Sequence, residues 1–240
     1  MTYGIVARCP RTGRLGVAAA SYSIAIGLYC SDVVRANTGA AVSLGAPNPG
    51  DGALGLRLLA QGFTPSHVLA ELIANDQNSD HRLIGIIDRE GNAAAHTGAK
   101  TRPWSGSKTG QDYVTLGDML AGAKVIDAIA EGYSSDPAAD LEERLLQALE
   151  AGRDAGGQRG GHGRLPERSA VVIVYGIQDY SDWDLRVDEH EKAIDELRRV
   201  HEEYKPNAAY YIERARKPEN AIPAMEFADM LAAQRPKEMP

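Results

Sequence analysis

The strand-like segments of this chain come in closely spaced pairs joined by turns. Residues 3–8 and 14–20 are rich in β-forming residues and enclose a turn that ends at Gly13. A second pair, residues 83–88 and 93–97, encloses a turn with Gly and Asn. Two strands joined by a short turn pair antiparallel, because parallel strands need a long crossover connection. The sequence therefore predicts antiparallel sheets.

The remaining predicted elements fall into blocks of one kind. Further strands are predicted at residues 39–44, 169–175 and 183–187, and helices at 52–61, from 66 onward, 119–130, 139–151, 189–203 and 224–233. The glycine-rich stretches 98–117 and 152–163 are predicted to be irregular. Helices that come in blocks between hairpins favour an α+β fold in which two stacked antiparallel sheets are covered by helices on both outer sides, a four-layer αββα sandwich.

Length and charge limit the possible partners. The chain has 240 residues and a net charge of −7, without a basic stripe, which argues against a nucleic-acid partner. It has no apolar run near the roughly 18–20 residues of a membrane span and no secretory pattern, so we expect no membrane partner and a cytoplasmic location. We expect one domain at 1–205, and at 206–240 either a helical extension or an arm that contacts other subunits. We also expect a homo-oligomer.

The cysteines and histidines do not form a metal-binding pattern. Cys9 and Cys30, the two cysteines, match no zinc spacing, and a disulfide is not expected in a reducing compartment. His162, His190 and His201 have no partner at metal-ligand spacing. We therefore expect neither a disulfide nor a metal site.

Thr2 is the first candidate for catalysis. Because Thr is small, we expect Met1 to be removed, which would leave Thr2 with a hydroxyl nucleophile and a free α-amine. Such an amine titrates near about 7.7–8.0, so part of it is neutral at physiological pH and can act as a base. Many proteins begin with Met-Thr, so this pattern gains weight only from the rest of the chain.

Several stretches, spread in order over residues 2–203, resemble a known family. They are residues 2–8, 12–18, Ser21, 48–49, 55–56, 58–59, 94–98, 104–106, Tyr113, 119–122, 156–160, 169–170 and 184–188. This set resembles the N-terminal-nucleophile hydrolases, and most closely their branch known as domain of unknown function 1028. The resemblance implies the four-layer αββα fold. It also implies Thr2 as the nucleophile that attacks an amide carbonyl.

Three positions depart from the family pattern. The chain has Asp118 where Asn is expected, Gln158 where Asp is expected, and Arg168 where Gln is expected. Each change can alter a polar contact around a pocket, so the substrate of a relative is not transferred to this chain.

Two further residues are candidates for catalysis. In related folds, a polar residue at the end of the second strand orients the terminal amine, which implies this role for Ser21; the alternative is a hydroxyl that bonds its own backbone. Asn48 follows the strand at 39–44, and its amide, with the backbone at Gly45, could stabilise the oxyanion; the alternative is an Asx turn.

Four residues are candidates for substrate binding. Arg159, in a glycine-rich stretch, could pair with a substrate carboxylate, although this stretch could also be a flexible loop. Gly45, His96 and Asp188 complete the set; His96 is alternatively a hydrogen-bonded core residue. Near Asp188, Arg186 either binds substrate or forms a buried ion pair.

Together these observations predict an N-terminal-nucleophile amidohydrolase that cleaves a small-molecule amide or peptide-like C–N bond. No cofactor is expected, because the N-terminus supplies both nucleophile and base. One alternative is a non-catalytic oligomeric binding or scaffold protein that keeps the fold. A second is a metal hydrolase that uses His96 with nearby carboxylates.

Overall fold

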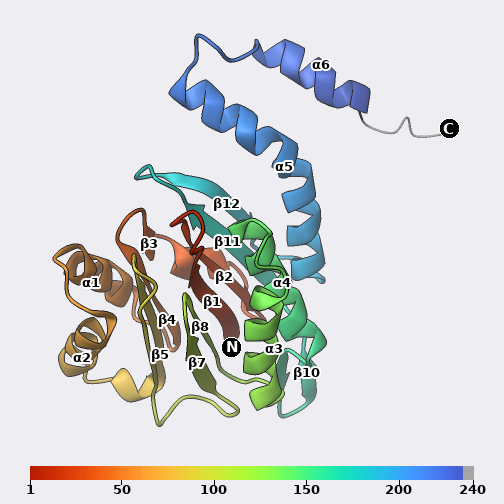
Figure 1. Cartoon of the computed structure of the whole chain (residues 1–240). Helices are drawn as coiled ribbons and strands as arrows, with labels where there is room; N and C mark the ends of the chain where they lie inside the picture. The colour runs from red at the N-terminus through yellow and green to blue at the C-terminus, as the bar shows by residue number, and fades with distance from the viewer. Residues whose placement is uncertain (235–240) are drawn as a thin grey trace. The chain divides into compact units, whose positions relative to one another are not determined.

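Two antiparallel sheets lie face to face in the computed structural model, which describes residues 1–234 (Figure 1). The larger sheet has six strands in the order β12 (Ser181–Val187), β11 (Ser169–Tyr175), β2 (Leu15–Ser21), β1 (Thr2–Arg8), β8 (Tyr113–Gly117) and β7 (Gly106–Gly110). The smaller sheet has four, in the order β3 (Val34–Arg35), β4 (Gly39–Gly45), β5 (Arg82–Asp88) and β6 (Ala93–Thr97). A separate two-stranded ribbon pairs β9 (Gln158–Gly160) with β10 (Gly163–Leu165).

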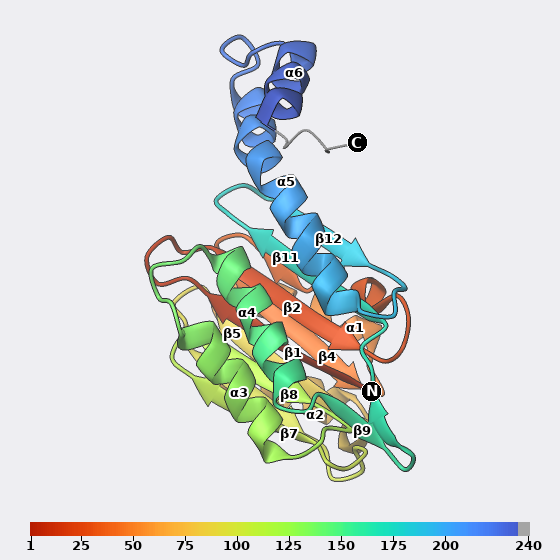
Figure 2. The same ribbon diagram turned by 90° about the vertical axis from the view of Figure 1, so that its right-hand side faces the viewer.

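Helices cover the outer face of each sheet. The helices α3 (Ala123–Ser134) and α4 (Leu141–Asp154) lie on the six-stranded sheet, whereas α1 (Pro49–Ala60) and α2 (Pro65–Asn75) lie on the four-stranded sheet (Figures 1 and 2). Two short 3₁₀ helices, Ile26–Cys30 and Ser79–His81, lie in connections. The fold is therefore the predicted α+β sandwich with the layer order αββα.

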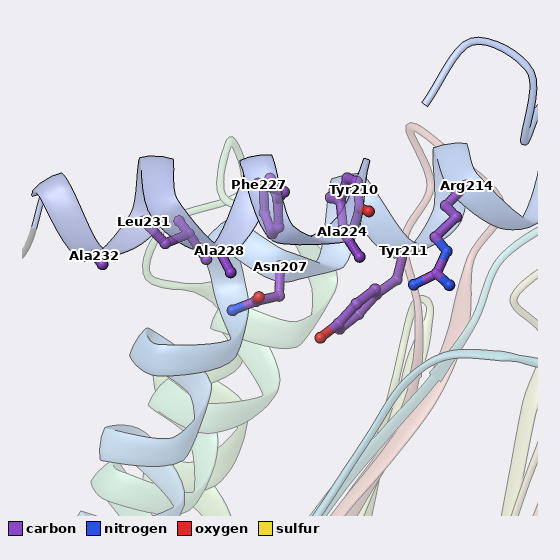
Figure 3. Close-up of a pocket in the computed structure, with 9 residues that line it drawn as sticks. All are labelled: Asn207, Tyr210, Tyr211, Arg214, Ala224, Phe227, Ala228, Leu231 and Ala232. Atoms are coloured by element: carbon purple, nitrogen blue, oxygen red, sulfur yellow. The ribbon is translucent and has the colours of Figure 1, made fainter. Parts of the chain in front are cut away.

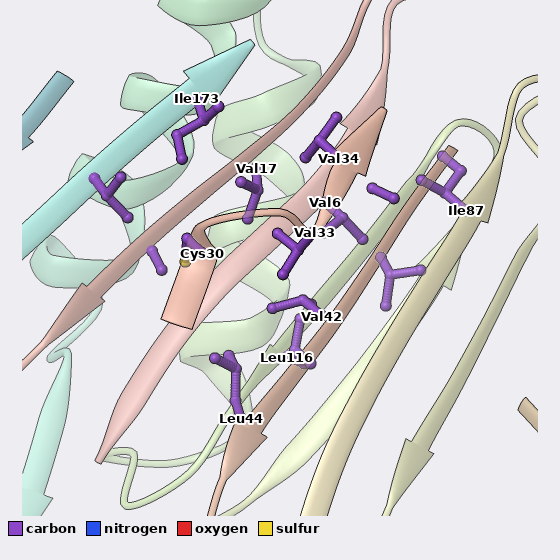
Figure 4. Packing of buried hydrophobic residues seen from close by; sticks show 14 of the residues in the cluster. Val6, Val17, Cys30, Val33, Val34, Val42, Leu44, Ile87, Leu116 and Ile173 are labelled. Atoms are coloured by element: carbon purple, nitrogen blue, oxygen red, sulfur yellow. The ribbon is translucent and has the colours of Figure 1, made fainter. Parts of the chain in front are cut away.

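The central strands are apolar on both sides because each sheet has a buried inner and outer face. Along β5, Leu83 and Ile87 pack into the core between the two sheets, part of which is drawn in Figure 4. The alternate residues Ile84 and Ile86 pack toward α1 and α2. Side chains in a strand alternate between faces, so a strand buried on both sides is read as a continuous apolar run.

The central pair of strands determines where the N-terminus lies. β1 and β2 pair along their whole length, with Thr2 opposite Ser21. On its other side β1 pairs with β8, with Tyr3 opposite Gly117. The start of β1, the end of β2 and the residues that follow β8 therefore meet at one end of the central strands of the six-stranded sheet.

Three sequence-based predictions are wrong in detail. The stretch 98–117 is predicted to be irregular but contains the hairpin of β7 and β8. The prediction misses β7 because this partly exposed edge strand has a Gly-Ser-Lys sequence without an apolar pattern. The stretch 152–163 contains the end of α4 and most of the β9–β10 ribbon. The helix predicted at 119–130 begins only at Ala123, because Met119 adopts a φ of 54° that a right-handed helix excludes.

The chain divides into two compact units between Arg198 and Arg199. The helix α5 (Ala193–Arg216) continues through Pro206, where the sequence predicts an extension to begin; a proline inside a helix costs one hydrogen bond but does not end this helix. In the second unit, Tyr210 stacks on Phe227 of α6 (Ala224–Gln234), with ring centroids 3.9 Å apart. Both line a cavity of about 360 Å³ (Figure 3). A role in subunit contacts stays a prediction.

Among residues 1–234, every helix falls short of the length and apolar character that crossing a bilayer requires.

Candidate active site

Thr2 begins β1, and its hydroxyl faces Ser21 at the end of β2. The two side-chain oxygens are 3.1 Å apart, and both residues are buried. The Ser21 hydroxyl also donates to the carbonyl of Met1 at 2.5 Å and accepts from the backbone N–H of Ser23 at 3.0 Å. Ser21 thus contacts Thr2, as an orienting role requires, and also bonds nearby backbone, as the structural alternative requires.

A buried carboxylate, that of Asp118, lies beside the backbone nitrogen of Thr2. Its Oδ1 accepts from the Thr2 N–H at 2.8 Å and lies 3.1 Å from the α-amine of Met1. In return, the Asp118 N–H donates to the Thr2 carbonyl at 2.9 Å. The start of β1 is therefore fixed against Asp118 by two reciprocal hydrogen bonds.

The charges around Asp118 act on an amine in opposite directions. Burial lowers the pKa of the Met1 α-amine, and this effect outweighs the neighbouring Asp118 carboxylate, which raises it. The Nε of Arg102 lies 3.4 Å from Asp118 Oδ2 and adds a second cationic group. An amine at this position is therefore neutral at a lower pH than an amine in water.

The loop that carries Asp118 is clamped between two other segments. The Met119 N–H donates to the Arg102 carbonyl at 3.2 Å, and the Met119 carbonyl accepts from the Arg159 N–H at 2.6 Å. The Gln158 side chain donates to the Asp118 carbonyl at 3.5 Å. This backbone bonding holds Met119 in its left-handed conformation and keeps the carboxylate of Asp118 against β1.

The remaining departures from the family pattern also contact this site. The Oε1 of Gln158 accepts from the Tyr22 N–H at 2.8 Å, and the Arg168 N–H donates to the Ser21 carbonyl at 2.7 Å. The sequence predicts no role for Asp118 or Gln158 beyond a possible change in a polar contact. Their departure from the family pattern is the sequence feature that points to the site, because Asp118, Gln158 and Arg168 all contact the start of β1 or the end of β2.

A cavity of about 250 Å³ opens at Thr2, and we call it the Thr2 pocket. Its walls combine apolar side chains with a few polar groups, as small-molecule sites do. The lining residues are Met1, Thr2, Ser21, Ser23, Ile24, Ile26, Tyr29, Leu44, Gly45, Pro47 and Arg102.

A family model described as a family of unknown function (DUF1028) matches residues 2–197. The chain belongs to the DUF1028 family. The crystal structure of protein SPO2555 from Silicibacter pomeroyi, assigned to the same family model, is 29% identical with a TM-score of 0.75. That match covers 85% of this chain and 88% of that chain, and it agrees with the αββα fold described above.

More distant structures add little to the comparison. Two structures of Thiobacillus denitrificans BPH, one of them in complex with epoxomicin, are 14% and 13% identical, with TM-scores of 0.39 and 0.38. Each match covers 74% of this chain and 99% or 100% of the other. A likeness this low carries no argument about function. No curated protein matches the chain.

In this DUF1028 protein, Gly45 and Asn48 have separate environments. Gly45 lines the Thr2 pocket with a φ of 82°, a conformation that favours glycine. Asn48 does not line the pocket. Its Oδ1 accepts from the Gly50 N–H at 3.0 Å, and its Nδ2 donates to Asp51 at 2.8 Å, so it caps the start of α1. The predicted oxyanion role of Asn48 is not supported, because both ends of the amide serve this cap.

The other predicted substrate-binding residues do not line the Thr2 pocket. Arg159 has an exposed side chain on β9, and Asp188 is exposed after β12, where its carbonyl accepts from the Ala25 N–H at 2.8 Å. The Nε2 of His96 lies 3.1 Å from the Ser79 carbonyl, which agrees with the hydrogen-bonded alternative. Of the predicted set, the pocket brings together Thr2, Ser21 and Gly45.

The alternation of charges on β12 also has a structural explanation. The Nε of Arg186 lies 2.7 Å from Asp184, and Nη2 of the same guanidinium donates to the other carboxylate oxygen at 2.8 Å. The pairing agrees with the alternative to substrate binding, but the two side chains are 34% and 36% exposed, so the ion pair is not the buried one that the sequence predicts.

Proposed function

We propose that this protein is an N-terminal-nucleophile hydrolase that cleaves the C–N bond of a small amide, with Thr2 as the nucleophile after removal of Met1. One observation carries the proposal. The hydroxyl of Thr2 lies 3.1 Å from Ser21 Oγ, and its backbone nitrogen lies 2.8 Å from the buried Asp118, while Thr2 and Ser21 both line one pocket.

Removal of Met1 would change the chemical roles of the groups at Thr2. The Thr2 nitrogen would become an α-amine that already has Asp118 Oδ1 as its hydrogen-bond acceptor. The Ser21 hydroxyl would lose the Met1 carbonyl as its acceptor and become available to orient Thr2. The same change would place nucleophile and base on one residue, which is a known way to activate a hydroxyl.

The reaction then proceeds in two stages. The Thr2 Oγ1 attacks the amide carbonyl carbon while its proton passes to the neutral α-amine, directly or through a water molecule. The intermediate collapses, the C–N bond breaks, and the ammonium returns the proton to the leaving nitrogen, which departs as an amine. Water then attacks the resulting ester of Thr2, and the carboxylic acid leaves as Thr2 regains its proton.

Asp118 acts in this scheme as a positioning residue. Its carboxylate holds the amine next to the hydroxyl and compensates part of the effect of burial on the amine pKa. Burial lowers the pKa of the Met1 α-amine, and burial of a Thr2 amine would act in the same direction, which increases the share of the neutral form that accepts the proton.

Two measurements on the purified protein test the proposal. Intact mass and N-terminal peptide mass should show that Met1 is absent. An alkyl β-lactone, which acylates a hydroxyl nucleophile by ring opening, should then add its full mass to the Thr2 peptide. Thr2→Ser should remain labelled and Thr2→Ala should not, although both keep a small residue after Met1. Failure of the processed protein to be labelled at Thr2 contradicts the proposal.

A non-catalytic scaffold is the second candidate, and the contacts of Met1 favour it. The Met1 amine pairs with Asp118 at 3.1 Å, and its carbonyl accepts from Ser21. A retained Met1 would therefore satisfy the polar groups that catalysis needs. Quantitative retention of Met1, together with the absence of labelling, would favour this scaffold function over hydrolysis.

A further inference from the structure

Arg102 separates the Thr2 pocket from a smaller neighbouring cavity. The smaller cavity has a volume of about 150 Å³, and Gly45 and Arg102 border both spaces. Asp118, His81 and Lys100 also line the smaller cavity. A molecule that extends beyond the Thr2 pocket on this side therefore meets the Arg102 guanidinium first.

The Arg102 side chain is anchored on one side and open on the other. Its Nε lies 3.4 Å from Asp118 Oδ2, and its Nη2 donates to the Gly45 carbonyl at 3.3 Å. A guanidinium carries five N–H donors, and within residues 1–234 no third protein group bonds this one. Because the side chain is 52% exposed, its remaining donors are accessible to a ligand.

The charges near Arg102 favour an anionic ligand. Among residues 1–234, Asp118 is the one carboxylate in the lining of either cavity; it borders the smaller one and already pairs with both Arg102 and the N-terminal amine. Lys100 lines the smaller cavity, where its ammonium pairs with Asp80 at 3.3 Å. When the amine is protonated, two cationic groups share a single carboxylate, so one further negative charge would balance the site.

The Thr2 pocket itself suits an apolar group. Ile24 and Tyr29 line it and are 55% and 40% exposed, and Ile26, Leu44 and Pro47 complete its apolar wall. A ligand that places an apolar group in this pocket would remove these side chains from water, which favours binding.

We propose that Arg102 binds a carboxylate of the substrate, and that the substrate is a small N-acyl amino acid whose apolar part occupies the Thr2 pocket. The backbone nitrogen of Thr2 and the Nε of Arg102 contact the two oxygens of the same Asp118 carboxylate, so a substrate carboxylate on Arg102 would lie close to a carbonyl at Thr2. In an N-acyl amino acid these groups have such a spacing. A planar guanidinium binds a carboxylate through two parallel hydrogen bonds. This assignment replaces Arg159 in the role that the sequence suggested, and it rests on the proposed function.

Binding to an inactive variant tests this assignment apart from catalysis. In the Thr2→Ala protein, titration calorimetry would compare N-isovalerylglycine with its carboxamide, two probes that differ only in charge at one end. We expect the carboxylate to bind at least roughly 10-fold more tightly. Adding Arg102→Gln should remove this preference, and Arg102→Lys should keep part of it. Arg159→Gln, an exposed arginine outside both cavities, is the matched control and should change neither affinity.

The outcomes separate the two proposals. Equal affinity for the two probes, absence of binding at millimolar concentration, or the same loss in Arg159→Gln overturns the role of Arg102. Because Arg102→Gln removes one of the two cationic partners of the buried Asp118, a double variant with Asp118→Asn checks that lost affinity does not come from misfolding. A protein that binds the carboxylate through Arg102 but is never acylated at Thr2 would contradict the hydrolase proposal alone.

Discussion

The two sheets of this DUF1028 protein use their polar side chains in different ways. At the end of the central strands of the six-stranded sheet, Thr2 bonds Ser21 and Asp118, which are 19 and 116 residues away in the sequence, and Thr2 and Ser21 line a pocket. In the four-stranded sheet, Asp88 accepts from the N–H groups of Glu90 and Asn92, at most four residues away. The first arrangement depends on the whole fold, whereas the second completes a local turn.

This difference separates polar groups that stabilise the fold from polar groups available for chemistry. A carboxylate that accepts several local hydrogen bonds stabilises a turn and has little capacity left for a ligand. A group that joins distant segments beside a cavity is costly to bury and is retained where it has a function. Substitutions in the two regions should therefore affect different measurements.

The largest effect is expected from Thr2→Ala, which removes the nucleophile. The rate of acylation by the β-lactone should fall by roughly 10³-fold or more. The free energy of unfolding should change by less than about 1.5 kcal/mol, because only a hydroxyl and a methyl group are lost. His96→Gln, in the four-stranded sheet, is the control and should leave the acylation rate unchanged. Equal acylation rates for Thr2→Ala and the unsubstituted protein would show that Thr2 is not the nucleophile and would contradict the difference drawn between the two sheets.

The second-largest effect is expected from Asp118→Asn, which introduces the residue that the family pattern favours at this position. Loss of the positioning carboxylate should lower the limiting acylation rate by roughly 10- to 100-fold. The rate rises with pH as the α-amine loses its proton. Because Asp118 raises the amine pKa against the lowering by burial, its removal should move this rise to lower pH.

A second buried carboxylate provides the control for the Asp118→Asn pH profile. Asp112 pairs with Arg8 at 2.9 Å and lines neither cavity at the site. Asp112→Asn should therefore leave the midpoint of the rate profile where it is. A shift to higher pH in Asp118→Asn would contradict the assignment of the amine as the base.

Asp88→Ala should affect stability and leave the chemistry intact. The substitution removes the acceptor of two backbone hydrogen bonds and of one from the Asn92 side chain, at a position that is 8% exposed. We expect the free energy of unfolding, measured with urea, to fall by about 1–3 kcal/mol. The acylation rate of the folded protein should stay the same. A large loss of acylation rate without a loss of unfolding free energy would show that a residue with only local hydrogen bonds can still act in the chemistry.

The sequence predicts the apolar strands well and the site only in part. β11 and β6 have the predicted bounds, because continuous β-branched or small apolar residues between turns leave few alternatives. The placement of Ser21 opposite Thr2 can be predicted, because Ser21 ends the second strand of the first hairpin. Asp118 could not be placed beside Thr2, because that contact depends on β8 pairing with β1, with Gly117 opposite Tyr3. Pairing between strands so far apart leaves no local pattern in either segment.

Asn48→Ala gives the smallest expected effect and the clearest test of an oxyanion role. As a helix cap, Asn48 should contribute about 1 kcal/mol to stability, whereas loss of an oxyanion donor would lower the acylation rate by roughly 10²–10³-fold. We expect the first result, with the rate unchanged.

The pH dependence of the Asn48→Ala effect has a definite sign. Burial raises the pKa of Asp51 above 3.8, and the hydrogen bond from Asn48 partly opposes this, so ionised Asp51 costs stability once the pH rises through its folded pKa. Without Asn48 this cost increases. The loss of unfolding free energy should therefore be larger at neutral pH than below about pH 3.8, where Asp51 is protonated in both proteins. A loss that is the same at both pH values would mean that Asn48 stabilises α1 through Gly50 alone.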